Sequence, residues 1–205
     1  MAVLADSNIA KRALAASLKQ LMESQPFDKI SIGDICEKCE MNRKSFYYHF
    51  KDKYDLVNWI YDTEFIAIVR QKEYATSWSF LEDLCGYFYN NRDFYRKTFQ
   101  VGGQNSFSDY FHDIVGLILT ADMEDVFGGD EHMGFYIDFL SDAFVCAVKR
   151  WIAARDCIPA GEFTEHLKRC LLKTSHKLSR PFHPGRTDKG RRFHVRRFYL
   201  AACTV

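Results

Sequence analysis

Apolar residues recur every three to four positions along most of this 205-residue chain, and no segment of appreciable length alternates as a β-strand does. A first amphipathic stripe, between residues 7 and 25, carries Ala10, Ala13, Leu14, Ser17, Leu18, Leu21 and Met22. Only 4 Pro and 11 Gly interrupt the chain, which favours helices over many short strands. The sequence therefore predicts an all-α fold.

Proline and helix-capping residues divide the first 72 residues into four predicted helices. Pro26 ends the first helix. Ser31, followed by Asp34, resembles a capping pair and predicts a second helix over about 32–39. After a tight turn at 40–42, Asn42 caps a short third helix over 43–49, and Asp52 caps a longer fourth helix over about 53–72.

Helical stripes continue beyond residue 73. They predict helices around residues 78–88, 94–99, 107–118, 132–154 and 160–177. The glycines at 102–103 break the chain, and the acidic stretch at 122–131, which contains a second glycine pair, is expected to be a loop.

Charge is distributed unevenly along the chain. Residues 73–178 hold 10 Lys and Arg against 16 Asp and Glu, a net charge of −6, whereas residues 1–72 carry +1 and residues 179–205 carry +6. Because the middle section would repel a polyanion, a nucleic-acid footprint is expected near the N-terminus or in the tail.

Residues 31–56, SIGDICEKCEMNRKSFYYHFKDKYDL, are the most informative stretch. Two short helices joined by a three-residue turn form a helix-turn-helix, whose second helix enters the DNA major groove. Phe46 and Phe50, four residues apart, would face the core. The open face and helix start then comprise Arg43, Lys44, Ser45, Tyr47, Tyr48 and His49. Arginine is the usual reader of guanine in this groove.

Two helix starts near this stretch are placed to meet phosphates. Lys51 and Lys53 combine side-chain charge with the free N–H groups that open the fourth helix. Ser31 and Ile32 lie at the corresponding end of the second helix. The predicted partner is a double-stranded DNA operator.

Residues 7–72 resemble the TetR/AcrR family of one-component bacterial repressors, most specifically over SFYYHFKDKYDL at 45–56. The resemblance implies that Lys53 contacts a phosphate and that Ser31 and Ile32 make contacts from the second helix. It also implies that the residues on the open face of the third helix touch DNA, namely Arg43, Lys44, Ser45, Tyr47, Tyr48 and His49. Two positions depart from the family pattern, because Glu40 stands where glycine is usual and Lys44 where the residue is often small. The segment at 39–61 is similar to a subgroup linked to dihydroxyacetone-kinase regulation.

The same resemblance implies a DNA-binding domain at 1–52 and a helical effector-binding and dimerisation domain at 53–178, acting as a homodimer on a palindromic operator. The helices at 132–154 and 160–177 are the expected dimer interface. If an effector pocket exists, we expect it among Trp78, Tyr87, Phe88, Tyr95, Tyr110 and Phe111. In the alternative, these rings fill a tight core. A partner protein would then dock on this domain to control the regulator, which could act as an activator of a dihydroxyacetone-kinase operon.

No catalytic residue, metal site or cofactor is predicted, and the protein is not expected to be an enzyme. The pair Cys36 and Cys39 has the spacing of a zinc or redox motif, but no further ligands stand at suitable positions. The chain shows neither a signal peptide nor an apolar run long enough to span a membrane, so a cytoplasmic location is expected. The basic tail at 179–205 reads as disordered or non-native, with extra phosphate contacts as the alternative.

Overall fold

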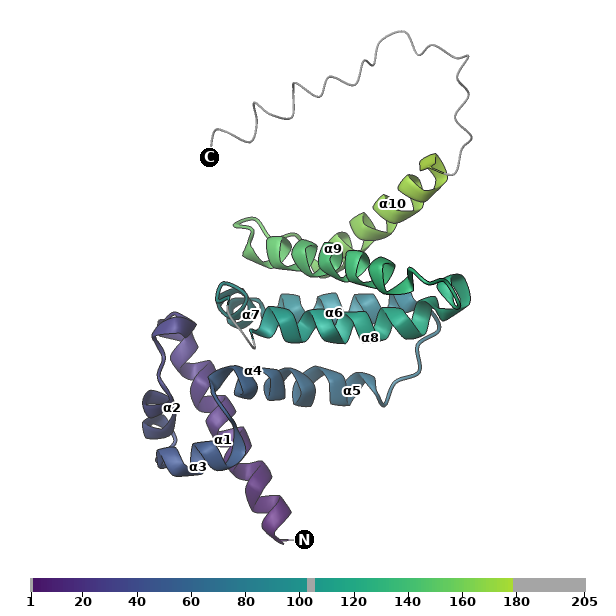
Figure 1. Cartoon of the computed structure of the whole chain (residues 1–205). Coiled ribbons are helices and arrows are strands. Elements are labelled where there is room, and N and C mark those ends of the chain that lie inside the picture. The colour runs from purple at the N-terminus through teal and green to yellow at the C-terminus, as the bar shows by residue number, and fades with distance from the viewer. Residues whose placement is uncertain (1, 103–105, 179–205) are drawn as a thin grey trace, which may run out of the picture. The chain divides into compact units, whose positions relative to one another are not determined.

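The computed structural model describes residues 2–102 and 106–178, and every regular element in these ranges is a helix (Figure 1). This confirms the all-α prediction. The chain divides after Lys168 into two compact units. The described part of the second unit, residues 169–178, is the end of helix α10 (Ala160–Leu178). The predicted basic tail at 179–205 lies outside the described residues.

Three helices form the N-terminal part, which we call the head (residues 2–52). They are α1 (Ala2–Ser24), α2 (Ile32–Lys38) and α3 (Arg43–His49), with a 3-10 turn at Phe27–Lys29. Helix α1 begins before the predicted start at Ser7, because the preceding residues include good helix formers and no proline or glycine. The buried core of the head includes Leu14, Leu18, Ile35 and Phe46.

The three predicted caps are confirmed. Ser31 and Asp34 form a complete capping box, in which the Asp34 N–H donates to Ser31 Oγ at 3.2 Å and the Ser31 N–H donates to Asp34 Oδ2 at 2.8 Å. The Ser45 N–H donates to Asn42 Oδ1 at 2.8 Å, and Asp52 accepts from two N–H groups of the next helix. These bonds set where the short helices begin.

A connecting helix (residues 53–69) leads from the head to the later helices. It comprises α4 (Lys53–Tyr61), a π-helical turn at Asp62–Ile66 and α5 (Ala67–Val69). The sequence predicted one helix over about 53–72, so the π turn is a feature that the apolar stripe did not reveal.

The later helices, which we call the body (residues 77–168), are α6 (Ser77–Asn90), α7 (Arg92–Thr98), α8 (Phe107–Phe127), α9 (Met133–Ala153) and the first turns of α10. The prediction of a loop at 122–131 was wrong for residues 122–127, since α8 continues to Phe127. Exposed acidic residues are compatible with a helix, and the chain breaks only at the glycine pair, where Gly129 has a φ of 82°.

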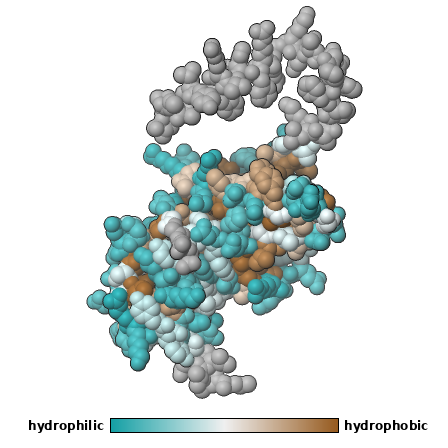
Figure 2. Space-filling view, viewed as in Figure 1, coloured by the Kyte–Doolittle hydropathy of each residue, from teal (hydrophilic) through white to brown (hydrophobic). Residues whose placement is uncertain are grey.

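The body core is built from aromatic rings around Tyr61, which the connecting helix inserts among them. Tyr61 is 1% exposed and contacts rings from α6, α7 and α8. Figure 2 shows apolar side chains also reaching the surface of the later helices in patches. No described helix is both long and apolar enough to pass through a membrane.

Candidate nucleic-acid interface

Helix α3 has one buried face and one open face, as its sequence pattern predicted. Phe46 and Phe50 are buried, whereas Tyr47 is 54% exposed and Tyr48 is 79% exposed. Arg43 and Lys44 are exposed in the first turn, and Ser45 and His49 are partly buried. The structure therefore places four of the predicted α3 residues on one open surface, with Ser45 and His49 next to it. Their contact with DNA stays a prediction.

Ring contacts orient the aromatic side chains of this surface. The Tyr47 ring meets Phe46 edge-on with centroids 5.7 Å apart, and Tyr48 meets His49 in the same way at 5.0 Å. Burial, with a smaller effect of Lys11, lowers the pKa of His49. The uncharged imidazole is thus favoured at neutral pH, which leaves Arg43 and Lys44 as the cations on α3.

The predicted residues at the two neighbouring helix starts differ in what they offer. Lys51 is exposed just before α4. Ser31 is exposed at the start of α2, where its hydroxyl already caps the helix, while Ile32 is partly buried against the core. Lys51 is therefore the side chain among these three that is best placed for a phosphate.

Lys53 occupies a position that the sequence did not predict. Its ammonium donates to the backbone oxygens of Phe27, Asp28 and Ile30 at 2.8, 3.2 and 2.7 Å, and it lies 4.7 Å from the centroid of the Phe27 ring. Burial lowers the pKa of Lys53. An ammonium has three N–H bonds, and all three are used inside the head, so a phosphate would compete with these oxygens.

The turn between α2 and α3 places Glu40 in the left-handed region, with a φ of 55°, where the family usually has glycine. The Met41 N–H donates to the Cys36 oxygen at 2.9 Å and holds the turn closed. The departure noted in the sequence therefore falls on the one described non-glycine residue with a positive φ.

We expect Glu40→Gly to raise the free energy of unfolding by about 0.5–1 kcal/mol, because glycine adopts this conformation without a Cβ clash. Chemical denaturation of the parent and the variant measures the change. Glu37→Gly, on the exposed face of α2, is the matched control and should lower stability by about 1 kcal/mol. A loss of stability in both variants would contradict the interpretation of the turn.

Five of the six residues predicted for an effector pocket come together in the body. Phe88, Tyr95 and Phe111 are fully buried, and the centroid of the Phe88 ring lies 4.9 Å from the ring centroids of both Tyr95 and Phe111. Tyr87 and Tyr110 lie at the edge of this cluster. Trp78 does not belong to it, since its ring lies under Lys168 of α10. The close ring packing favours the tight-core alternative.

Two open grooves lie elsewhere. One, of about 510 Å³, lies between α8 and α9 and includes His112, Asp142 and Lys149. The other, of about 670 Å³, lies between α1 and the corner of α6 and α7 and includes Glu23, Arg92 and Arg96. Both are lined largely by charged side chains, unlike the aromatic pocket that the sequence suggested.

The cysteine pair of α2 has ordinary structural contacts. Cys36 is buried, and the Cys39 thiol donates to the Ile35 oxygen at 3.3 Å. Burial raises the pKa of the Cys36 thiol, which disfavours the reactive thiolate. Within the described residues, no group of three His, Cys, Asp or Glu side chains is placed to hold a metal ion.

Comparison with known proteins assigns the chain to a class. A family model described as bacterial regulatory proteins, tetR family, matches residues 13–60, and a model described as transcriptional regulator C-terminal region matches residues 76–173. The first spans most of the head and all but the last residue of α4, and the second spans the body. The chain belongs to the TetR family of transcriptional regulators, which confirms the resemblance read from the recognition-helix sequence.

Individual relatives are similar over most of the chain. It is 27% identical over 154 residues to the HTH-type dhaKLM operon transcriptional activator DhaS of Lactococcus lactis subsp. lactis (strain IL1403), covering 74% of this chain and 77% of that protein. Two solved structures share the fold: a dihydroxyacetone kinase operon activator DhaS (21% identity, TM-score 0.58) and a TetR transcriptional regulator from Streptococcus agalactiae 2603V (18% identity, TM-score 0.62). Each match covers 81% of this chain and 96% of the other.

Proposed function

We propose that this regulator binds a palindromic operator as a homodimer, with α3 of each protomer in a major groove. The observation that carries the proposal is the open surface of α3, where Arg43, Tyr47 and Tyr48 are exposed directly after a satisfied N-cap. The N-terminal residues of a recognition helix lie nearest the base edges. Arg43 is thus the proposed base reader, with Lys44, Ser45, the two tyrosines and His49 around it.

Phosphate contacts would flank this helix on both sides. Lys51 stands exposed before α4, and Ser31 opens α2, a helix start that presents backbone N–H groups. Such contacts hold the head in register on the duplex without reading its sequence.

A homodimer is supported by an exposed apolar stripe along α9. Phe135 and Phe139 are 69% and 63% exposed, stack on each other, and are followed at helical spacing by exposed Ala143 and Cys146. Exposed apolar stripes of this kind mark protein interfaces. With α9 and α10 as the seam, two heads would meet half-sites about 34–36 Å apart or a multiple of that distance.

The body would switch DNA binding by favouring one arrangement of the two heads, which requires an effector that binds the two states with different affinity. A small molecule is one form of this effector. A partner protein docking on the body is the second, and the closed aromatic cluster favours it. The relative named as an operon activator supports a role as activator of a dihydroxyacetone-kinase operon. We propose no catalytic role.

Arg43→Ala should weaken binding to the operator by about 1–3 kcal/mol and relax the preference at one base position in each half-site, since one bidentate contact is lost. Fluorescence anisotropy on the operator and its single-base variants measures both effects. Arg155→Ala, which removes an exposed arginine beyond α9, is the matched control and should bind as the parent does. Equal losses on all base variants would refute the assignment of Arg43 as a base reader.

A further inference from the structure

The π turn in the connecting helix carries two carboxylates, and both bind other helices. Asp62 accepts a hydrogen bond from the Tyr110 hydroxyl of α8. Glu64 is bound from two sides, by Lys19 of α1 and by Tyr87 of α6. π-helical turns are rare and occur frequently at functional sites. This one lies between the head and the body and contacts both.

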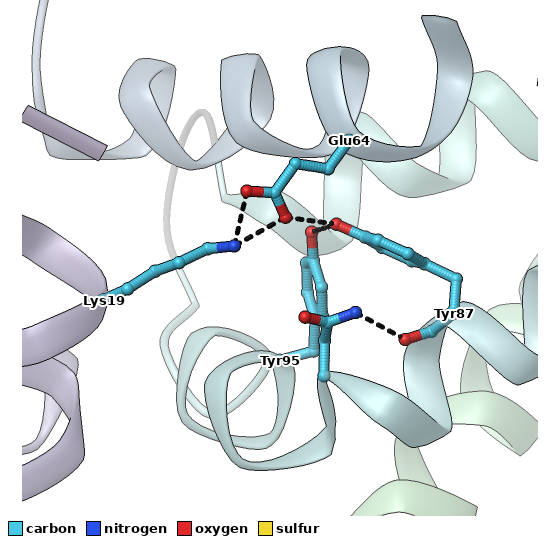
Figure 3. A network of polar contacts seen from close by, with 5 residues as sticks. Lys19, Glu64, Tyr87 and Tyr95 are labelled. Carbon is cyan, nitrogen blue, oxygen red and sulfur yellow. Dashed lines mark hydrogen bonds and ion pairs between the residues drawn. The ribbon is translucent and has the colours of Figure 1, made fainter. Parts of the chain in front are cut away.

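Four residues form a continuous polar network from α1 to the body core (Figure 3). The Lys19 ammonium lies 2.5 Å from both carboxylate oxygens of Glu64, and the Tyr87 hydroxyl donates to Glu64 Oε2 at 3.3 Å. The Tyr87 and Tyr95 hydroxyls are 2.7 Å apart. We call Lys19, Glu64, Tyr87 and Tyr95 the coupling network.

A single order of protons satisfies the coupling network. If Tyr95 donates to Tyr87, then Tyr87 can donate its own proton to the Glu64 carboxylate. Burial raises the pKa of both phenols, so both remain protonated and able to donate at neutral pH. Tyr95 itself is fully buried between Phe88 and Phe107. The Tyr95 ring, and the hydroxyl that it carries, can therefore shift only if the neighbouring rings of the aromatic core repack.

The body holds the end of α1 at a second place. The Lys97 ammonium of α7 donates to the backbone oxygens of Met22 and Glu23 in the last turn of α1, and to that of Gln25 just after the helix. A cation at a helix C-terminus is favourable, because the last carbonyl groups lack partners within the helix. Since α2 and α3 pack on α1, its orientation on the body sets the orientation of α3.

We propose that Glu64 is a positioning residue for DNA binding. Through Lys19 it sets the orientation of the head on the body, and its bond to Tyr87 makes that orientation depend on the packing around Tyr95. This inference rests on the proposed function, whose DNA-binding surface it would regulate. In a dimer, two firmly oriented heads accept one separation of half-sites, whereas loosened heads tolerate others.

The test compares binding to the selected operator with binding to the same operator carrying one inserted base pair between its half-sites. Glu64→Gln and Lys19→Met should each weaken operator binding about twofold to fivefold, the range of partly exposed ion pairs. Each should also reduce the penalty of the insertion. The double variant should be no weaker than either single variant, because both remove the same contact.

The charge swap, Lys19→Glu with Glu64→Lys, should restore operator affinity and spacing preference towards those of the parent. Glu23→Gln is the matched control, the same chemical change on an exposed residue of α1. Additive losses in the double variant, or an insertion penalty unchanged in the single variants, would overturn the proposal.

If the parent protein showed no sequence-specific DNA binding, the proposed function would be refuted. The role of Glu64 in positioning α1 would then be tested by measuring hydrogen exchange of backbone amides. The amides of residues 19–24 should exchange about twofold to fivefold faster in each single variant than in the parent. In the double variant they should exchange no faster than in either single variant. Unchanged or additive rates would show that Glu64 does not position α1.

Discussion

Phe88→Ala should lower the free energy of unfolding by about 3–5 kcal/mol, the largest effect that we expect from a single substitution. The Phe88 ring is fully buried and contacts rings from α4, α7 and α8, including a stacked Tyr61 at 5.8 Å. Removing it leaves a cavity at the point where these helices meet. Urea denaturation followed by circular dichroism measures the loss.

The same variant distinguishes a packed core from an effector pocket. If Phe88 lined an open cavity, its removal would forfeit few contacts, and a loss below about 1 kcal/mol would contradict the packed-core interpretation. Glu82→Ala, exposed on the same helix, is the control and should change stability by less than about 0.5 kcal/mol.

Lys53→Met should lower the free energy of unfolding by about 2–3 kcal/mol, because three backbone oxygens lose their charged donor together. Methionine retains most of the aliphatic stem, so the loss reports on the ammonium. Thermal and urea denaturation of the full chain measure it. The salt dependence of operator binding should stay close to that of the parent.

Lys51→Met provides the matched comparison, since Lys51 stands two residues earlier and is exposed. It should leave stability unchanged and reduce the slope of log affinity against log salt concentration by about 0.9, the value of one lost phosphate contact. A Lys53→Met variant that keeps its stability but loses salt dependence would show that the ammonium turns to a phosphate instead.

Local features of this fold could be predicted from the sequence because their causes are local. The caps at Ser31, Asn42 and Asp52 each depend on a polar side chain and an N–H two or three residues away. The open face of α3 follows from the four-residue spacing of Phe46 and Phe50. The strained turn at Glu40 was visible as a departure from the family pattern.

Other features depend on contacts between distant segments and could not be predicted from the sequence. Lys53 reaches backbone oxygens 23 to 26 positions earlier, and every residue has such an oxygen, so the amino-acid sequence does not indicate which ones will accept. Glu64 binds Lys19 across 45 positions. The π turn interrupts a stripe that reads as regular, and the acidic residues at 122–127 suggested a loop although they form an exposed end of α8.

Selection of bound fragments from a random pool of double-stranded DNA shows whether a pair of α3 helices recognises an operator. We expect enrichment of two inverted copies of one short half-site, with centres about one helical turn, or a multiple of it, apart. We also expect Arg43→Ala to enrich the same arrangement with one position relaxed in each copy. Enrichment of no motif, or of a motif without inverted symmetry, would contradict recognition of an operator by a pair of α3 helices.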